Sequence, residues 1–290
     1  MAHKYKRLAE KYPMRRAVIT GAAAGLGKAL ACELRQDGWS LLLIDQDAEG
    51  LAELEREFES STAEISSAAI DVADDRKLSA AIASFCDRNG GVDLLVNSAG
   101  IGLAGFSDEA KAEDLRKVFE VNVIAPAVAA AAVLPYMRRS DCGHVLNIAS
   151  AAAYHCLPWI GGYSASKAAV VALTENLCAE NHGSGVTASV MVSAFFQSSM
   201  SKYTIGATLA KERTAGLMAM SKLTARDAAV LTLRGVEAGG PYVFIGSQAR
   251  VIYWIKRWLP RVWLRVARRL SEKAYAEADA IIASGAARAS

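Results

Sequence analysis

Short apolar runs alternate with longer amphipathic segments along most of the chain. The runs are typical of buried strands, and the spacing of apolar residues between them is typical of helices. This alternation predicts an α/β protein in which helices cover both faces of a parallel sheet. The predicted strands are residues 16–20, 41–44, 64–70, 92–96, 144–149, 186–192 and 242–245. The predicted helices include residues 48–60, 74–89, 109–139, 164–181 and 225–238, and Pro126 is expected to bend the third of these.

The pattern divides the chain into three segments. Residues 1–15 are a helical or loose lead-in, residues 16–247 a single α/β domain, and residues 248–290 a basic, amphipathic helical extension. Apolar residues recur at helical spacing from Ile252 to Leu270, and Pro260 predicts a break between two short helices. Residues 250–273 hold eight Lys or Arg and one acid, a net charge of +7. Such a segment suits either an anionic membrane surface or a cover over the protein's own cleft or a subunit contact.

Composition narrows the class of protein. With 52% hydrophobic and 22% charged residues, the chain is globular rather than disordered. The net charge of the whole chain is +3, so the part outside residues 250–273 is acidic, which argues against a nucleic-acid partner. No apolar run reaches the roughly 18 residues of a membrane span, and the basic start lacks the apolar core of a signal peptide. The five cysteines are scattered without a Cys-x-x-Cys pair, so we expect reduced thiols, no metal site and a cytoplasmic protein, with peripheral membrane contact left open.

A glycine-rich turn follows the first strand. Gly21 permits a tight turn, Gly25 lets the backbone approach a pyrophosphate, and Gly27 lets the next helix lie close to the sheet. The second strand ends on Asp45, 24 residues after Gly21. This is the sequence form of a dinucleotide-binding βαβ unit, and it predicts a Rossmann-type, doubly wound sheet. Asp45 would accept hydrogen bonds from ribose hydroxyls and repel a 2′-phosphate, so NAD is favoured over NADP.

Polar residues and glycine gather where the predicted strands end. The residues at these ends are Gly21, Asp45, Asp71, Asn97, Ser150 and Ser193. Ligands of parallel sheets bind at the carboxyl ends of the strands, so these positions predict one composite site.

Tyr163 and Lys167 are spaced i, i+4 and would share one face of a helix. A nearby ammonium group favours the phenolate, and the hydroxyl of Ser150 can hold a substrate oxygen against the phenol. Together these groups predict a general acid/base for an alcohol or a carbonyl.

These motifs together resemble the classical short-chain dehydrogenase/reductase family, over about residues 16–246. In the family's order, the motifs are Thr20-Gly21-x-x-x-Gly25-x-Gly27, Asp71-Val72, Asn97-Ser98-Ala99-Gly100, Asn122, Ser150 and Tyr163-x-x-x-Lys167. The resemblance implies that Tyr163 donates or accepts the proton, while Lys167 lowers its pKa and holds the nicotinamide ribose. It also implies that Ser150 orients the substrate oxygen and that Asn122 holds a water linking Lys167 to solvent.

The resemblance further implies a cofactor cleft, with Asp71 and Val72 at the adenine. The cofactor-binding residues it implies are Thr20, Gly21, Gly25, Leu26, Gly27, Asp45, Asp71, Val72, Asn97, Ala99, Gly100, Tyr163, Lys167 and Ser198. The chain departs from the family after the sixth strand, where Pro-Gly is usual and Ala194-Phe195 follows Ser193 here. We therefore expect an altered loop, with Ser198 still supplying a hydroxyl.

Aromatic residues near Ser150 predict an apolar substrate pocket. The expected substrate-binding residues are Ser150, Tyr154, Trp159, Phe195 and Phe196. Residues 199–223 are Met-rich with weak periodicity and lie where the family places a substrate lid. We expect His155 in the pocket wall or on the surface rather than in catalysis.

The predicted function is an NAD(H)-dependent oxidoreductase that transfers a hydride between nicotinamide and a hydrophobic secondary alcohol or ketone, or an aldehyde. The alternatives are an NADP-preferring carbonyl reductase and a non-catalytic, cofactor-sensing or membrane-associated protein of the same fold. The resemblance also implies a homodimer or homotetramer through the helices around Asn122 and Tyr163.

Overall fold

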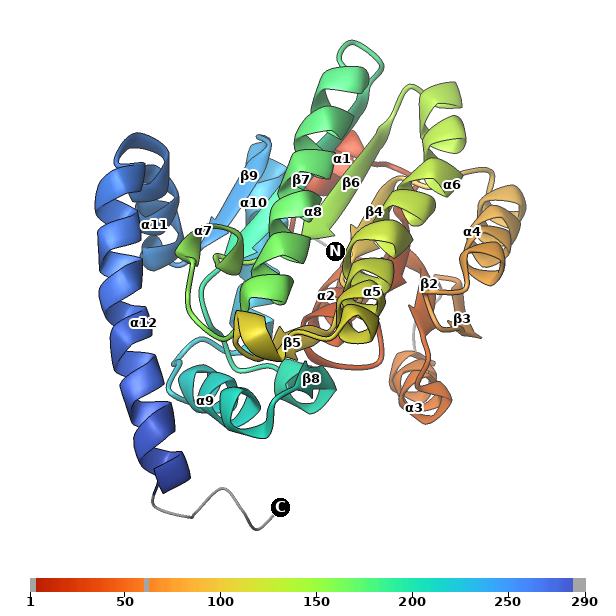
Figure 1. Cartoon of the computed structure of the whole chain (residues 1–290). Helices are drawn as coiled ribbons and strands as arrows, with labels where there is room; N and C mark the ends of the chain where they lie inside the picture. Colours follow the sequence, from red (N-terminus) through yellow and green to blue (C-terminus); the bar gives the residue numbers. More distant parts are fainter. Residues whose placement is uncertain (1–3, 60–62, 284–290) are drawn as a thin grey trace.

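Seven parallel strands form the central sheet of the computed structural model, which describes residues 4–59 and 63–283 (Figure 1). The strands are β1 (Arg16–Thr20), β2 (Ser40–Asp45), β3 (Ile65–Ala69), β4 (Leu94–Asn97), β6 (Gly143–Ile148), β7 (Val186–Ser193) and β9 (Tyr242–Ile245). Their order is β3-β2-β1-β4-β6-β7-β9, so the chain winds outward from β1 in one direction and from β4 in the other. This order confirms the predicted Rossmann-type, doubly wound α/β fold.

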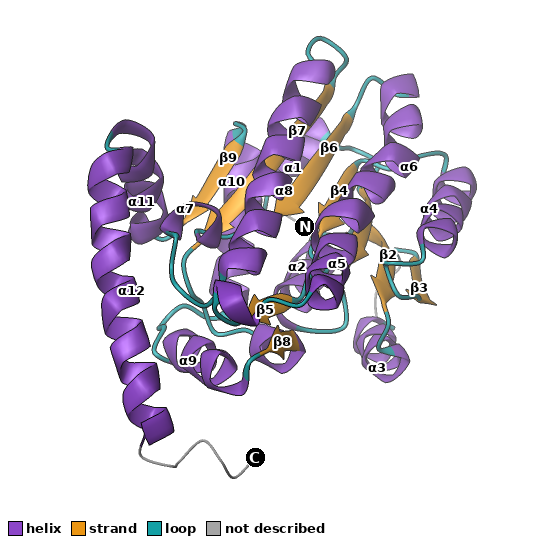
Figure 2. Cartoon of the chain, viewed as in Figure 1, coloured by secondary structure: helices purple, strands orange, loops and turns teal. Residues whose placement is uncertain are grey.

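Helices cover both faces of the sheet, as Figure 2 shows. The helices packed on it are α1 (Lys6–Lys11), α2 (Gly25–Gln36), α3 (Ala48–Phe58), α4 (Asp75–Asn89), α6 (Ala125–Arg139), α8 (Gly161–Glu180) and α10 (Ala225–Ala238). Side chains of a strand alternate in direction, so β1 contributes to two cores. Ala17 and Ile19 pack with α2 and α10, whereas Val18 packs with α4 and α6.

The lead-in is packed into the first of these cores. Tyr5, Leu8 and Tyr12 are buried against it. The Tyr5 hydroxyl donates a hydrogen bond of 2.8 Å to the buried carboxylate of Glu33, which also pairs with Lys4. These contacts hold α1 beside α2 and α10.

The helix predicted over residues 109–139 is divided in the structure. α5 (Ala112–Phe119) runs into a π-helical turn, Glu120–Ile124, and then into α6. Pro126 has no N–H to offer the carbonyl of Asn122, so the α-helical hydrogen-bond ladder is interrupted there. Among the described residues, the stretch Ala112–Arg139 is the one helix long and apolar enough to cross a membrane by length and composition. Its α6 part packs into the core with α4.

The predicted lid, residues 199–223, contains short ordered elements. They are a 3-10 turn (Ser199–Tyr203), β8 (Thr204–Gly206) and α9 (Thr208–Ala219). β8 pairs in parallel with β5 (Gly102–Ala104), which follows β4, in a separate two-stranded sheet. A Cβ atom on Gly206 would lie 1.9 Å from the Ala104 carbonyl oxygen, so the close approach of these two strands requires glycine. The pair ties the lid to the segment after β4.

The C-terminal extension folds as two helices beside β9, at the edge of the sheet (Figure 1). α11 (Ser247–Trp258) and α12 (Pro260–Ala283) are separated immediately before Pro260. α12 has 24 residues, so it is longer than the short helix that the sequence predicts. The pair packs against α7 (Ala152–His155), the short helix that follows Ser150.

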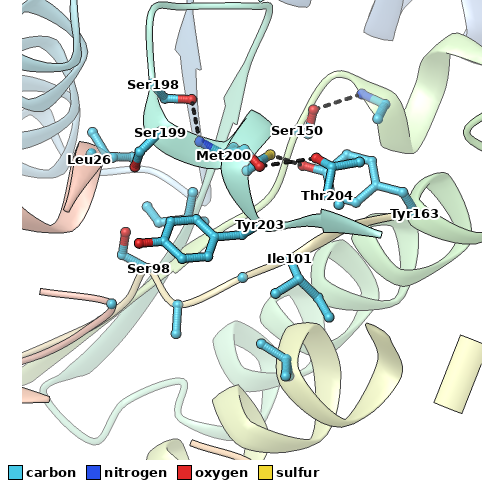
Figure 3. Close-up of a pocket in the computed structure, with 18 of the residues that line it drawn as sticks. Leu26, Ser98, Ile101, Ser150, Tyr163, Ser198, Ser199, Met200, Tyr203 and Thr204 are labelled. Carbon is cyan, nitrogen blue, oxygen red and sulfur yellow. Dashed lines mark hydrogen bonds between the residues drawn. The ribbon is translucent and has the colours of Figure 1, made fainter. Parts of the chain in front are cut away.

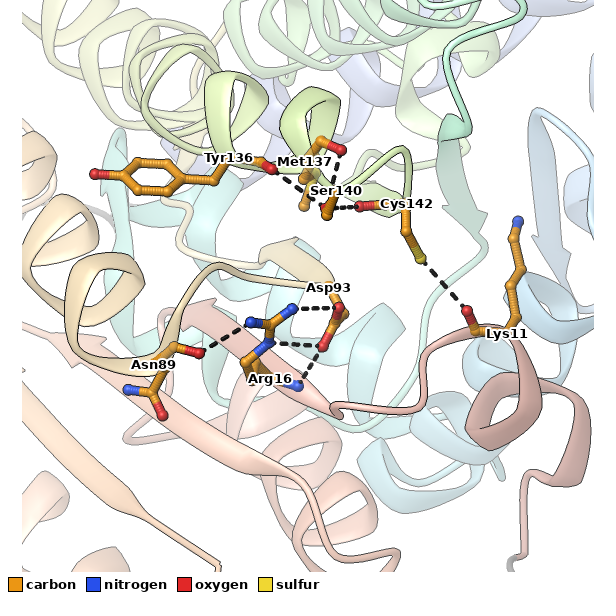
Figure 4. Close-up of polar contacts among 8 residues, drawn as sticks. All are labelled: Lys11, Arg16, Asn89, Asp93, Tyr136, Met137, Ser140 and Cys142. Atoms are coloured by element: carbon orange, nitrogen blue, oxygen red, sulfur yellow. Dashed lines mark hydrogen bonds and ion pairs between the residues drawn. The ribbon is translucent and has the colours of Figure 1, made fainter.

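A buried ion pair joins the beginning of β1 to the residue before β4 (Figure 4). The Arg16 guanidinium donates to Asp93 from Nη2 at 2.9 Å and from Nε at 3.1 Å. The Arg16 backbone N–H donates to the same carboxylate at 2.9 Å, and Nη1 donates to the Asn89 carbonyl at 2.9 Å. The two side chains are only 8% and 3% exposed, so solvent offers little alternative to these partners.

We expect Asp93→Ala to lower the free energy of unfolding by about 3–5 kcal/mol, because it leaves the buried Arg16 charge without its partner. Chemical denaturation followed by circular dichroism measures this change. Glu10→Ala is the matched control, since the Lys6–Glu10 pair is exposed and 3.9 Å apart. That control should change the same quantity by less than about 1 kcal/mol. Similar effects from the two substitutions would contradict the prediction.

Candidate active site

A cavity of about 390 Å³ opens at the carboxyl ends of the central strands (Figure 3). Residues at or just after the ends of five strands line it, namely Gly21, Asp45, Ser98, Ser150 and Ser193. β1 and β4 are neighbours from which the chain winds in opposite directions, and parallel sheets open a crevice at such a point. Five of the six predicted strand-end positions, Asp71 among them, therefore line one cavity, whereas Asn97 does not.

The glycine turn forms one wall of this cavity. A Cβ atom on Gly27 would lie 1.9 Å from the Gly21 carbonyl oxygen, and one on Gly21 would lie 2.7 Å from the Ala99 backbone nitrogen. Both contacts are with backbone, which cannot move aside. Gly25 and Leu26 line the cavity at the beginning of α2, where backbone N–H groups have no helical acceptor. This wall fits the pyrophosphate of a dinucleotide.

Asp45 is held against the glycine turn by two backbone hydrogen bonds. Its Oδ2 accepts from the Ala23 N–H at 3.0 Å, and its Oδ1 accepts from the Asp47 N–H at 3.1 Å. The cavity-lining residues next to it in the chain and on the neighbouring loop are Gln46, Ile70, Asp71 and Val72. These four residues carry no positive charge, so this part of the wall does not offer a site for a 2′-phosphate.

Some of the predicted cofactor residues support the cavity from behind instead of lining it. Thr20 Oγ1 accepts hydrogen bonds of 3.2 Å from the N–H groups of Ser98 and Ala99. The Asn97 side-chain amide donates to the Pro126 carbonyl at 3.2 Å and to Asn147 Oδ1 at 2.8 Å. These bonds fix the loop after β4, whose Ala99 and Gly100 line the cavity, as does Ser198 across from them.

Asn122 joins the π turn to the segment after β4. Its Oδ1 accepts from the Ile101 N–H at 2.9 Å. Its amide donates to the Ile101 carbonyl at 3.0 Å and to Ser166 Oγ at 3.0 Å. Asn122 therefore clamps the Ile101 backbone from both sides and connects it to α8, which carries Tyr163. Its role in holding a water stays a prediction.

Tyr163 and Lys167 lie on one face of α8, as their spacing predicts. Lys167 Nζ is 5.8 Å from the centre of the Tyr163 ring and donates to the Ile148 carbonyl at 2.8 Å. The Tyr163 side chain lines the cavity, and its hydroxyl donates to the thioether sulfur of Met200 at 3.6 Å. The Ser150 side chain lines the same cavity, and its hydroxyl accepts from the Ala152 N–H at 3.1 Å.

Burial dominates the proton affinities of this pair. It raises the pKa of Tyr163 to about 12, although the neighbouring Ser150 hydroxyl acts in the opposite direction. It lowers the pKa of Lys167 to about 8, so the ammonium form still prevails at neutral pH. The net shift of the Tyr163 pKa in the protein alone is therefore upward, and the lowering contribution of Lys167 stays a prediction. The physical reason is that both groups are buried and the Lys167 ammonium is directed at the Ile148 carbonyl.

The apolar wall differs in part from the prediction. Phe195 and Phe196 line the cavity, but Tyr154 and Trp159 do not. The Tyr154 ring packs edge-on against Tyr253 of α11 at 5.2 Å between ring centres, so it faces the extension. Trp159 packs instead beside the small core cluster that includes Tyr163.

His155 lines the cavity, where the sequence places it in the wall or on the surface. Burial lowers the pKa of its imidazole to about 4, so the ring is neutral at physiological pH. Its edge packs against Phe195 with 6.5 Å between ring centres.

Further residues of the wall lie outside the predicted substrate-binding set. Ile101 and Leu103 come from the segment after β4, which the sequence does not assign to the substrate, and Met200, Tyr203, Thr204 and Met218 come from the predicted lid. β5 and β8 have three residues each, which is too short for a periodic pattern to reveal them.

The sheet topology and this cavity define a Rossmann-type nucleotide-binding fold. A family model described as short chain dehydrogenase matches residues 15–207, and the chain belongs to that family. The match ends before α11 and α12.

Two curated relatives and one solved structure illustrate the family. The chain is 33% identical over 191 residues to 2-(R)-hydroxypropyl-CoM dehydrogenase of Xanthobacter autotrophicus, covering 64% of this chain and 76% of the relative. It is 32% identical over 191 residues to 2-dehydro-3-deoxy-L-rhamnonate dehydrogenase (NAD(+)) of a Sphingomonas species, covering 66% and 75%. A short-chain dehydrogenase/reductase from Burkholderia phymatum in complex with NAD superposes with a TM-score of 0.75 at 31% identity, covering 79% of this chain and 88% of that one.

We expect Asn122→Ala to lower the free energy of unfolding by about 1–3 kcal/mol, because it leaves the Ile101 N–H and carbonyl groups without their partner. The amide of Ile101 should also exchange its hydrogen faster, and hydrogen-exchange mass spectrometry over residues 101–104 measures this. Asn176→Ala is the matched control, since Asn176 bonds only to Ala172 within the exposed face of α8. An unchanged exchange rate at residues 101–104 in the Asn122 variant would refute the clamp.

Proposed function

We propose that this chain is an NAD(H)-dependent oxidoreductase that transfers a hydride between nicotinamide and a hydrophobic secondary alcohol or ketone, or an aldehyde. The observation that carries the proposal is the placement of Tyr163. Its side chain lines the same cavity as Ser150, the glycine turn and Asp45. A proton-transfer group and a dinucleotide wall thus share one space.

The residues of the cavity fit a dinucleotide along its length. Gly21, Gly25 and Leu26 would hold the pyrophosphate at the beginning of α2, and Asp45 would accept the ribose hydroxyls. Asp71 and Val72 would contact the adenine. Nicotinamide, when bound, supplies or accepts the hydride. The NAD(+) in the name of the Sphingomonas relative and the NAD complex of the Burkholderia structure support NAD, as does the acidic wall at Asp45.

The chain's own residues transfer the proton. In alcohol oxidation, the phenolate form of Tyr163 accepts the hydroxyl proton and becomes the phenol, while Ser150 holds the substrate oxygen. In carbonyl reduction, Tyr163 returns the proton. The Lys167 charge, 5.8 Å from the ring centre, opposes the burial that disfavours the phenolate.

The wall beside Tyr163 favours a hydrophobic small molecule. Among the residues that line it are Leu157, Phe195, Phe196, Met200 and Met218. Apolar and flexible side chains of this kind suit irregular lipophilic substrates.

We also propose a cytoplasmic homodimer or homotetramer that contacts other copies through α6 and α8. A shallow, largely apolar groove of about 210 Å³ lies between these helices, lined by residues such as Ala130, Leu134 and Leu173. The five cysteines are all unpaired, which supports a reducing compartment.

Tyr163→Phe should lower kcat for alcohol oxidation by roughly 10²–10⁴-fold, because the variant has no group to accept the proton. The wild-type rate should rise with pH, since burial raises the pKa of Tyr163 to about 12 and the phenolate fraction grows towards that value. The variant should lose this rise. NADH absorbance across aliphatic, aromatic and steroidal alcohols measures both effects. Tyr136→Phe, which changes a hydroxyl at the surface bonded to Asp87, is the control. Unchanged turnover in the Tyr163 variant would remove it from the mechanism.

Asp45→Asn should reduce the preference for NAD over NADP in kcat/KM by roughly 10–100-fold, because like-charge repulsion of a 2′-phosphate is worth a few kcal/mol. Asparagine keeps one acceptor oxygen for the backbone amides and removes the charge. Asp47→Asn is the matched control, because Asp47 caps α3 through the Gly50 N–H nearby and does not line the cavity. A preference that stays the same in both variants would exclude Asp45 as its source.

A further inference from the structure

Exposed apolar side chains form a stripe along the outer side of α11 and α12. This outer stripe consists of Trp254, Trp258, Leu259, Val262, Val266 and Leu270. The spacing within each helix is three or four residues, which places its members on one face. Trp258 is 72% exposed and Trp254 is 47% exposed, although tryptophan is usually well buried. The two helical parts of the stripe join at the turn, where Trp258 and Leu259 are adjacent in the chain.

Another face of each helix is fixed to the body of the protein. Ala249 and Ala267 are buried there. Lys256 Nζ donates to the Ala153 carbonyl at 3.1 Å, and Trp263 Nε1 donates to the Tyr154 carbonyl at 2.9 Å. The outer stripe is therefore held outward and cannot turn into the core without breaking these bonds. The residues found to line the active-site cavity include none from α11 or α12, so the stripe is not the wall of the substrate site.

Basic side chains flank the outer stripe. The exposed ones are Arg257, Arg261, Arg265, Arg268, Arg269 and Lys273. Within the described ranges, the ion pairs of the protein involve none of these residues. Residues 250–273 carry eight basic residues and one acid, while the whole chain carries a net charge of +3. The positive charge is thus concentrated where the apolar stripe is exposed.

We propose that the outer stripe docks on the surface of an anionic lipid bilayer, with its tryptophans in the interface and the flanking cations at the lipid phosphates and carboxylates. An amphipathic helix rich in Trp and Arg is the form that lies in such an interface. A second copy of this chain would bring the same excess of positive charge against the stripe, which opposes self-association. A nucleic acid would satisfy the cations and leave the apolar residues in water.

The test is flotation of the full chain with lipid vesicles. Vesicles of phosphatidylcholine containing about one-third phosphatidylserine should carry the protein, and phosphatidylcholine alone should carry far less. High salt should weaken the binding because it screens the charges. Arg265→Glu with Arg269→Glu should weaken it by at least roughly 25-fold, since each cation near such a surface contributes about a factor of five. Trp258→Ala with Val262→Ala should weaken it by on the order of tenfold through lost apolar burial.

Matched controls change equally exposed residues elsewhere. Met220→Ala alters a side chain that is 81% exposed at the end of α9, and Arg76→Glu with Arg116→Glu reverses two exposed charges on α4 and α5. These variants should keep vesicle binding within about twofold. Circular dichroism melting verifies that every variant is folded.

Three results would overturn the proposal. The first is failure of the wild-type chain to float with the anionic vesicles. The second is equal binding by the tail variants and the controls. The third is evidence that the stripe binds another partner while the chain does not bind vesicles. That evidence would be a dimer that Trp258→Ala with Val262→Ala abolishes, or retention of the chain on duplex DNA.

Discussion

The turn out of β1 is packed backbone against backbone, and the site is built around that contact. The Gly21 carbonyl lies where a Cβ atom of Gly27 would be, and Gly21 itself lies against the Ala99 backbone. Any side chain at either glycine would push α2 from the sheet or β1 from the loop after β4. The cavity needs α2 to lie close to the Gly21 turn and that turn to lie close to Ala99, because the beginning of α2 and the Ala99 loop are two of its walls. The geometry of the nucleotide site therefore depends on glycine at both positions 21 and 27, where even the methyl side chain of alanine would not fit.

Buried polar side chains behind the cavity then fix its remaining walls. Thr20, Asn97 and Asn122 each hold backbone groups of loops that bear on the site, and each is nearly inaccessible to solvent. An unpaired buried polar group is more costly than a lost surface hydrogen bond, so these side chains define a single loop conformation. This explains how residues that do not line the cavity belong to the same motifs as those that do. Thr20 holds the loop after β4, and Asn122 connects that segment to α8, which carries Tyr163.

The sequence predicts the sheet and most of the nucleotide wall because both depend on local signals. Apolar runs, glycine spacing and strand-end polar residues lie within short segments, and Gly21, Asp45 and Asp71 meet as predicted. The substrate wall depends on contacts between distant segments, and there the prediction is less accurate. Tyr154 is close to Ser150 in the chain but faces α11, while Met200 and Leu103 reach the cavity through a pair of three-residue strands. The pKa of Tyr163 also depends on burial, which spacing on a helix does not reveal.

The hydrogen bond from Tyr163 to Met200 holds the phenol hydroxyl only weakly. A thioether is a weak acceptor, and 3.6 Å is a long contact. The phenol O–H of Tyr163 thus donates to an acceptor weaker than any alcohol or carbonyl oxygen. Replacing the Met200 sulfur by such an oxygen as the acceptor therefore costs little energy. Because Met200 belongs to the lid, the same exchange also releases one of the lid's contacts with α8. In the proposed mechanism, a substrate oxygen that took this hydrogen bond would therefore also separate Met200 from α8, so the lid would respond to the functional group of the ligand as well as to its bulk.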